Sequence, residues 1–195
     1  NHLAIVMADV SGKGVPAALF MMISKTLIKS AAQTGMSPKY ILEKVNNQLC
    51  ENNEAGMFVT VWIGLLEIST GKMICANAGH EYPAIRRKNG QFELLKDRHG
   101  FVLAGMEDMK YTEYEITLEP GDMIFVYTDG VAEATNAENE LFGTERMMEG
   151  LNSATYEDCK ELLQAVHKEI DGFVGDSPQF DDITMLSLRI SDIDV

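Results

Sequence analysis

Three short aspartate-containing segments carry the residue types that suit a divalent cation. They are residues 9–14 (Asp-Val-Ser-Gly-Lys-Gly), 128–130 (Thr-Asp-Gly) and 180–184 (Phe-Asp-Asp-Ile-Thr), and each lies beside an apolar run. A carboxylate at the end of a buried strand costs free energy unless its charge is compensated, and carboxylates gathered at one place repel each other. A hard cation such as Mg²⁺ or Mn²⁺ removes both costs, because it prefers carboxylate, carbonyl and water oxygens.

The composition is that of a globular protein and limits its partners. The 195 residues suffice for one domain with a substantial core, and 46% hydrophobic and 24% charged residues are ordinary values. The net charge of −14 argues against non-specific binding to nucleic acid or to an anionic membrane surface, since both need basic residues. A phosphorylated substrate would need a local positive centre, which a bound metal ion supplies.

Cysteine usage and targeting patterns bear on the compartment. The chain has three cysteines, Cys50, Cys75 and Cys159, and no Cys-x-x-Cys pair, so we expect buried, reduced thiols. We find no apolar run that approaches the ~20 residues of a membrane span, and no secretory signal pattern in the first residues. We therefore expect a cytoplasmic protein in which this part of the chain does not contact a membrane.

Apolar periodicity predicts two helices, a strand-rich block and two further helices. Pro16 and the Ser37-Pro38 pair fit the first turns of the leading helices. We expect their inward stripes at positions 19, 22, 23, 26 and 27 and at positions 41, 42, 45 and 49. Strands are expected at 1–7, 57–68, 73–78, 82–87, 91–95, 111–118, 123–127 and 183–190, with a hairpin at Asn89-Gly90.

The last helices complete the predicted architecture. Helical pattern resumes near Thr144, and Thr155 with Asp158 has the spacing of a capping box that opens the final helix. The inward stripe of that helix is expected at positions 159, 162, 163, 166, 170 and 173. Helices on both sides of a largely antiparallel strand block indicate an α+β fold.

The acidic motifs, in this order, resemble the metal-dependent serine/threonine protein phosphatases of the PPM type. The resemblance is to the bacterial branch typified by stage II sporulation protein E and the phosphatases that control sigma-factor partner switching. It rests on residues 9–18 (Asp-Val-Ser-Gly-Lys-Gly-Val-Pro-Ala-Ala), 77–80 (Asn-Ala-Gly-His), 127–131 with Glu133-Ala134, and 180–184. Each motif alone is weak, but four in order across nearly the whole chain are highly specific.

The resemblance implies both a fold and a metal site. The fold is an αββα sandwich, in which two mainly antiparallel sheets are flanked by helix pairs, with two Mn²⁺ or Mg²⁺ ions in the cleft between the sheets. Carried over residue by residue, Asp9 would bridge both metals and the Val10 carbonyl would contact one of them. Asp129 and Asp181 would ligate the other. Asp182 stands where many relatives have Asn, so it is expected just outside the ligands or as an occasional ligand.

One departure from the family concerns the start of the chain. The family's upstream acidic motif, which helps to hold the second metal, would lie before Asn1. We therefore interpret residues 1–195 as a PPM-type phosphatase domain that lacks its upstream strands and comes from a longer protein with regulatory domains. The resulting sheet edge could allow self-association as a homodimer.

The implied activity is the hydrolysis of phosphoserine or phosphothreonine on a partner protein by metal-activated water. By resemblance, the partner is an anti-sigma-factor antagonist in bacterial signalling. No covalent intermediate is needed, and Ser11 indeed lies in no Gly-x-Ser-x-Gly motif. Lys13 and Asn77 are candidates for binding the substrate phosphate. His80 is a candidate general acid for the leaving oxygen, although it could instead hold its loop by hydrogen bonds.

Two other interpretations stay open beside this one, and two more lack the spacing that they would need. Taken singly, the aspartates could be turn residues, which is a usual role of Asp before Gly. Gly12-Lys13-Gly14 lacks the spacing of an ATP-binding P-loop, and the acidic residues 133–140 lack that of a calcium loop. The main rival is a non-enzymatic, partner-binding domain with an incomplete metal site.

Overall fold

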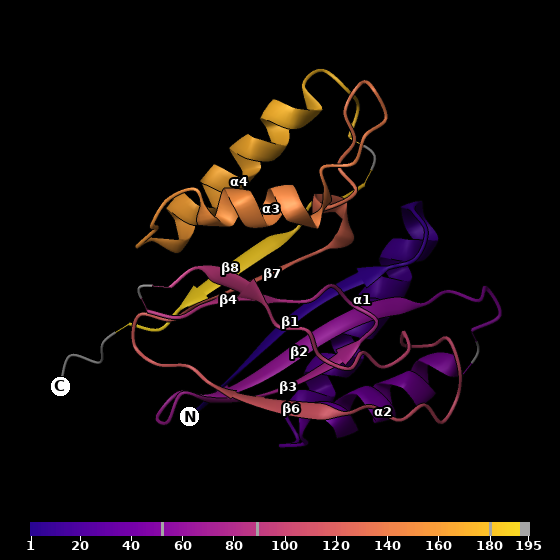
Figure 1. Ribbon diagram of the computed structural model, residues 1–195. Helices are drawn as coiled ribbons and strands as arrows, with labels where there is room; N and C mark the ends of the chain where they lie inside the picture. Colours follow the sequence, from indigo (N-terminus) through magenta and orange to yellow (C-terminus); the bar gives the residue numbers. More distant parts are fainter. Residues whose placement is uncertain (52, 89, 180, 192–195) are drawn as a thin grey trace. The chain divides into compact units, whose positions relative to one another are not determined.

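The strands and helices of the chain group into two units, each with its own sheet (Figure 1). The computed structural model describes residues 1–51, 53–88, 90–179 and 181–191. The first unit comprises Asn1–His80 and Asp97–Thr117, and the second comprises Glu81–Lys96 and Leu118–Val195. Within the described residues each unit holds one antiparallel four-stranded sheet and two α-helices, which confirms the α+β expectation.

The sheet of the first unit has the strand order β1-β2-β3-β6. Its strands are β1 (His2–Val10), β2 (Val59–Glu67), β3 (Lys72–Ala78) and β6 (Glu113–Thr117). Strand β1 pairs along its whole length with β2, which sets Asp9 opposite Thr60. Val59, Val61 and Ile63 of β2 pack into one core with the helices, while Trp62, on the other face of the strand, is also fully buried. Burial on both faces explains the continuous apolar run of this strand.

Helices α1 (Gly14–Ala32) and α2 (Pro38–Cys50) belong to the first unit and pack against each other. The four stripe positions expected for α2 are confirmed: Ile41, Leu42, Val45 and Leu49 are all buried. The helix predicted here is confirmed, but the inward stripe predicted for it is wrong except at Leu27, which is partly buried against the core. The buried residues of α1 are Ala17, Ser24, Ile28 and Ala31, whereas Leu19, Met22 and Ile23 are each more than half exposed. The helix is apolar nearly all round, so periodicity alone could not select the buried face.

Helix α1 also corrects our statement about membrane spans. Within the described residues it is the one helix long and apolar enough to cross a bilayer by length and composition. A core helix of a soluble protein passes the same test, so this single match is weak support for a span.

The sheet of the second unit has the strand order β5-β4-β7-β8. Its strands are β5 (Phe92–Leu94), β4 (Ala84–Arg86), β7 (Met123–Tyr127) and β8 (Met185–Arg189). Strands β4 and β5 form the expected hairpin, in which Asn89 lies outside the described residues. A short 3₁₀ turn, η1 (Asp129–Val131), follows β7.

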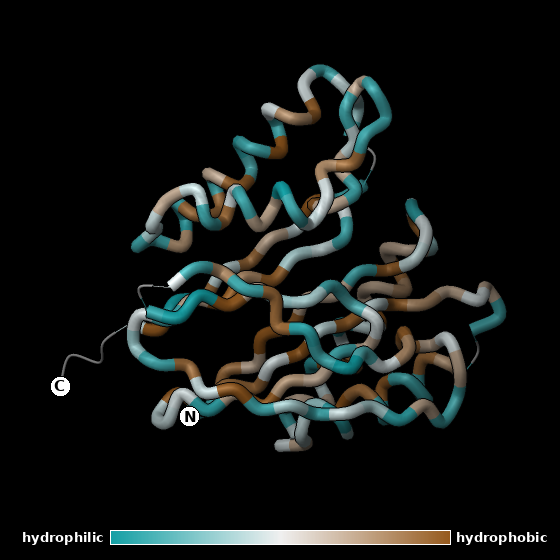
Figure 2. The backbone as a smooth tube through the Cα atoms, in the orientation of Figure 1, coloured by the Kyte–Doolittle hydropathy of each residue, from teal (hydrophilic) through white to brown (hydrophobic). Residues whose placement is uncertain are grey.

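Helices α3 (Gly143–Asn152) and α4 (Cys159–Val174) complete the core of this unit. Figure 2 shows polar and apolar residues alternating along α4, as in an amphipathic helix. Leu162, Val166 and Ile170 are buried, as the periodicity predicted. The expected capping box at Thr155 is wrong. Asp158 itself caps the helix, because its side chain accepts a hydrogen bond of 2.6 Å from the Lys160 backbone N–H.

Candidate functional site

The first acidic motif leaves the end of β1 through a tight, glycine-dependent turn. The Ser11 N–H donates to the Phe58 carbonyl at 2.9 Å, and the Phe58 N–H donates to Ser11 Oγ at 2.9 Å, so the turn is tied to the chain before β2. Gly12 and Gly14 have φ angles of +82° and +80°, which disfavour any side chain even though the space around them is open. Lys13 between them is exposed.

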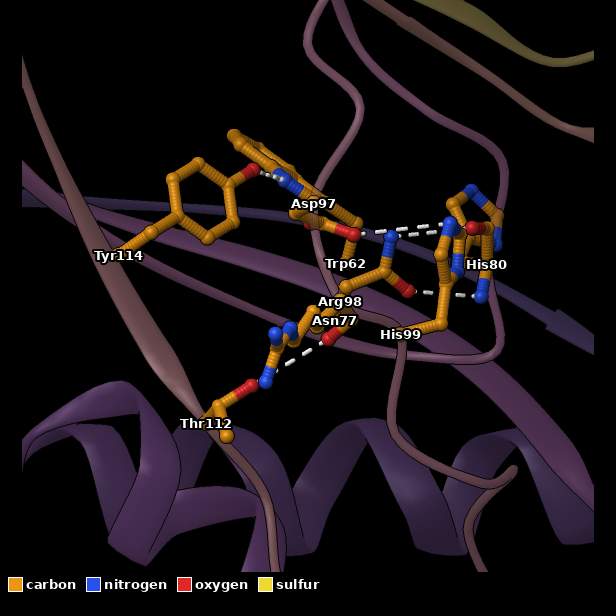
Figure 3. A network of polar contacts seen from close by, with 8 residues as sticks. All are labelled: Trp62, Asn77, His80, Asp97, Arg98, His99, Thr112 and Tyr114. Carbon is orange, nitrogen blue, oxygen red and sulfur yellow. Dashed lines mark hydrogen bonds and ion pairs between the residues drawn. The ribbon is translucent and has the colours of Figure 1, made fainter.

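The loop of residues 77–80 is held by its own asparagine (Figure 3). Asn77 Oδ1 accepts from the His80 N–H at 2.8 Å, and Asn77 Nδ2 donates to the His80 carbonyl at 3.0 Å. Both residues are buried. The Asn77 amide therefore uses its oxygen and one of its two N–H protons to hold the loop, which supports the loop-holding interpretation of this motif.

The His80 ring is linked to the first acidic motif within the same unit. His80 Nδ1 lies 2.8 Å from Thr60 Oγ1, and the Thr60 hydroxyl donates to the Asp9 carbonyl at 3.4 Å. A hydroxyl has one proton, so donation to Asp9 assigns Thr60 Oγ1 as the acceptor of a proton from Nδ1. On this assignment the ring nitrogen Nδ1 of His80 carries a proton.

The second and third acidic motifs are brought together in the second unit. The Thr128 N–H donates to the Thr184 carbonyl at 3.0 Å, and the Thr184 N–H donates to Thr128 Oγ1 at 3.1 Å. The Thr128 hydroxyl then donates to the Asp182 carbonyl at 3.1 Å. Gly130 lies so close to this segment that an added Cβ would clash with the Asp182 carbonyl. Motifs about 50 residues apart are thus locked side by side, except for Phe180, which lies outside the described residues.

Four carboxylates of the second unit influence one another. Burial raises the pKa of Glu133, and the charges of Asp129 and Asp181 raise it further. Burial also raises the pKa of Glu81, with additional contributions from Asp129 and Glu133. Concentrated negative charge of this kind makes a proton or a cation favourable at the same place.

Glu81 and Glu133 were missed as site residues by sequence reasoning. Glu81 directly follows the 77–80 motif, and Glu133 is itself one of the residues that carry the family resemblance, but neither was assigned to the site because neither has ligand spacing of its own. The oxygen-rich donor set suits a hard cation. Among the described residues, however, no three or more His, Cys, Asp or Glu side chains form a ready-made ligand cluster.

A pocket of about 240 Å³ adjoins this acidic region within the second unit. Gly130, Asp181 and Ile183 line one side, and the end of α4 with residues 177–179 lines the other. The Gln179 side chain donates to the Asp181 carbonyl at 2.8 Å, and the Asp182 N–H donates to Asp181 Oδ1 at 2.8 Å. Asp181 is therefore held at the wall of a small polar cavity.

Comparisons with known proteins agree with the motifs. The model of the family described as stage II sporulation protein E matches residues 1–191. Protein IcfG of Synechocystis sp. is 32% identical over 96% of this chain and 34% of its own length. Phosphoserine phosphatase RsbU of Bacillus subtilis is 29% identical over 97% of this chain and 56% of its own length. The chain thus spans about a third to a half of these curated relatives.

Solved structures show the same fold. The PP2C phosphatase domain of SpoIIE from Bacillus subtilis, solved with a fragment of its regulatory domain, has a TM-score of 0.83 at 16% identity, covering 97% of this chain and 55% of that one. The catalytic domain of the serine/threonine phosphatase PstP, solved with two manganese ions, has a TM-score of 0.69 at 14% identity, covering 97% and 88%. At these identities the likeness establishes the fold alone, and the expected PPM-type fold is confirmed.

Proposed function

Because this chain belongs to the stage II sporulation protein E (SpoIIE) family, we propose that residues 1–195 form a metal-dependent protein phosphatase domain. Its reaction is the hydrolysis of phosphoserine or phosphothreonine on a partner protein. The observation that carries the proposal is the locking of the Asp129 turn onto residues 182–184. The charges of Asp129 and Asp181 raise the pKa of Glu133 beside this lock, and a bound cation would compensate that negative charge.

The proposed cofactor is Mn²⁺ or Mg²⁺, with two ions bound. We assign Asp9, the Val10 carbonyl, Asp129 and Asp181 as ligands, with Asp182 as an occasional one. The carboxylate and carbonyl donors fit these hard cations, and the raised pKa of Glu133 marks the negative charge that a cation would offset. A pair of such ions, when bound, neutralises phosphoryl oxygens and lowers the pKa of a water towards neutrality.

The remaining site residues have supporting roles in the proposal. Lys13 is exposed beside two glycines, so its ammonium group can approach a phosphate on a large protein substrate. His80 is proposed to donate a proton to the leaving seryl or threonyl oxygen after taking up a second proton. Asn77 holds the His80 loop, and its direct contact with phosphate stays a prediction.

The proposed substrate class follows the relative named phosphoserine phosphatase RsbU. We propose that the partner is an anti-sigma-factor antagonist, that the domain works in the cytoplasm without contacting nucleic acid or membrane, and that it can form a homodimer. A second candidate is a partner-binding domain without activity. It is favoured by the lack of a ready-made ligand cluster among the described residues.

A phosphatase assay separates the two candidates. The protein is incubated with a phosphoserine peptide and Mn²⁺, with and without EDTA, and released phosphate is measured. The proposal expects metal-dependent turnover that Asp129→Asn abolishes. The matched control is Asp108→Asn, which removes a carboxylate from an exposed position and should leave turnover unchanged. Equal turnover in EDTA would contradict the metal-dependent reaction, and metal-independent partner binding without turnover would favour the second candidate.

A further inference from the structure

A buried carboxylate that the proposed reaction does not use lies beside the 77–80 loop. Asp97 belongs to the first unit, and its side chain is 5% exposed. Figure 3 shows it among Asn77, His99 and Tyr114. A buried aspartate is costly, so its surroundings must favour it or its position must serve another residue.

The segment that carries Asp97 packs directly on the 77–80 loop. The Gly100 N–H donates to the Asn77 carbonyl at 2.8 Å. Gly79, at φ +70°, lies so close to Val102 that an added Cβ would be 2.8 Å from its Cγ1. The Thr112 hydroxyl donates to the Arg98 carbonyl at 3.3 Å and ties the segment to the chain before β6. Movement of this segment would therefore move the loop.

The groups around Asp97 attract its negative charge but do not form good hydrogen bonds with its carboxylate oxygens. His99 Nε2 lies 3.5 Å from Asp97 Oδ1, and the Asn77 amide and the Tyr114 hydroxyl also face the carboxylate. Tyr114 is itself held by the Trp62 indole N–H at 2.9 Å. Among the described residues, neither Asp97 oxygen has a hydrogen bond of good geometry. Burial consequently outweighs these attractions and raises the pKa of Asp97.

The Asn77 amide is the link between Asp97 and the site. One of its two N–H protons goes to the His80 carbonyl and its oxygen accepts from the His80 N–H. The second N–H is the one that Asp97 can attract. The two hydrogen bonds with the His80 backbone select one amide orientation, because a flipped amide would face an N–H with its own N–H and a carbonyl with its own oxygen. Asp97 reinforces that orientation by attracting the second N–H.

We propose that Asp97, paired with His99, is a positioning residue that orients Asn77 and thereby fixes the His80 ring and, through Thr60, the Asp9 end of β1. The inference rests on the proposed function for its catalytic consequence. Its structural consequence stands alone: without Asp97 the 77–80 loop should sample a second arrangement in which Nδ1 of His80 leaves Thr60.

The test combines a ring-specific signal with turnover. The chain has four histidines, so two-bond ¹H–¹⁵N spectra resolve the tautomer of each ring. In Asp97→Leu we expect the His80 signals to change from one tautomer to a mixture, and kcat to fall about 10- to 100-fold with little change in KM, since misplaced groups lower kcat. Asp97→Asn should change kcat by less than about threefold, because its amide oxygen still accepts from Asn77.

Two further variants guard against a folding artefact. His99 is partly exposed, so His99→Leu is expected to fold and to change the His80 signals in the same direction as Asp97→Leu. Asp122 of the second unit is equally buried and bonds only structural groups of that unit, including Arg87 at 2.6 Å. Asp122→Asn should therefore lower the melting temperature and leave the His80 signals unchanged.

The outcomes separate this inference from the proposed function. Wild-type His80 signals and kcat in folded Asp97→Leu, or in His99→Leu should the former not fold, overturn the positioning role. If the protein shows metal-dependent turnover that Asp129→Asn abolishes, such a result refutes the positioning role alone. If wild-type protein shows no turnover while Asp97→Leu still changes the His80 signals, positioning is supported and the proposed function fails.

Discussion

A single methyl group at position 130 should separate the two acidic motifs of the second unit. In Gly130→Ala the added Cβ would clash with the Asp182 carbonyl oxygen and would lie 2.9 Å from its carbon. Both are backbone atoms, so no side chain can rotate to relieve the overlap. The 182–184 segment must move away from the Asp129 turn.

The expected cost follows from the contacts at that point. Overpacking of a well-packed site typically costs about 1–3 kcal/mol. The displaced segment also strains the three hydrogen bonds that join Thr128 to residues 182–184, each worth about 0.5–1.5 kcal/mol. We expect a loss of about 2–3 kcal/mol in the free energy of unfolding, which leaves a protein of ordinary stability folded. Mn²⁺ affinity should fall at least about tenfold, equivalent to about 1.4 kcal/mol.

Urea denaturation and calorimetric Mn²⁺ titration measure these two quantities. The matched control is Gly172→Ala in α4, where an added Cβ meets nothing within 4 Å. Alanine is the better helix former, so this variant should be more stable by up to about 1 kcal/mol and should bind Mn²⁺ unchanged. Wild-type stability and Mn²⁺ affinity in Gly130→Ala would refute the proposal that this close contact assembles the metal site.

Four further predictions concern stability and reactivity. Asp158→Ala should lower the free energy of unfolding by about 1 kcal/mol in urea melts, because α4 loses its N-cap, and an unchanged value would show that the cap is not formed. Leu42→Ala in α2 should lower the free energy of unfolding by about 2–5 kcal/mol, because Leu42 is buried. Met22→Ala in α1 should lower it by less than about 0.5 kcal/mol, because Met22 is exposed, and comparable losses would contradict the observed buried face of α1. Burial raises the pKa of Cys75 to about 12, so its thiol should resist iodoacetamide at pH 8 until urea unfolds the chain, and rapid labelling of native protein would refute this. Burial raises the pKa of Asp97 in the folded protein, so its contribution to the free energy of unfolding is complete below the unfolded-state pKa of about 4 and is lost as the pH rises through the folded-state pKa. Asp97→Asn should flatten this part of a plot of melting temperature against pH, and an identical plot would contradict the prediction.

Local pattern was sufficient for much of the fold. The stripe of α2, the largely buried run of β2 and the β4–β5 hairpin were predictable from apolar spacing and turn residues. The four motifs were also enough to indicate the family and its PPM-type fold. These features are short-range, so the sequence within a few residues determines them.

Other features depended on partners distant in the chain. The buried face of α1 was not predictable, because the helix is almost uniformly apolar and its orientation depends on how it packs against α2 and the sheet. The N-cap of α4 is Asp158 rather than Thr155, and the spacing of residues in the sequence does not resolve this difference of three positions.

Within the candidate site, the aspartates were visible in the sequence but their environment was not. Asp129, Asp181 and Asp182 stand in motifs, whereas Glu81 and Glu133 owe their raised pKa values to burial and to charges brought near by folding. Asp97 owes its raised pKa to burial alone, which outweighs the attraction of His99. Residue type and order are written in the chain and determined the family. The burial of a side chain and the distances between charged groups are defined only once distant segments pack together. Burial and these distances determine which carboxylates repel each other, which carboxylate orients Asn77 and which position accepts only glycine.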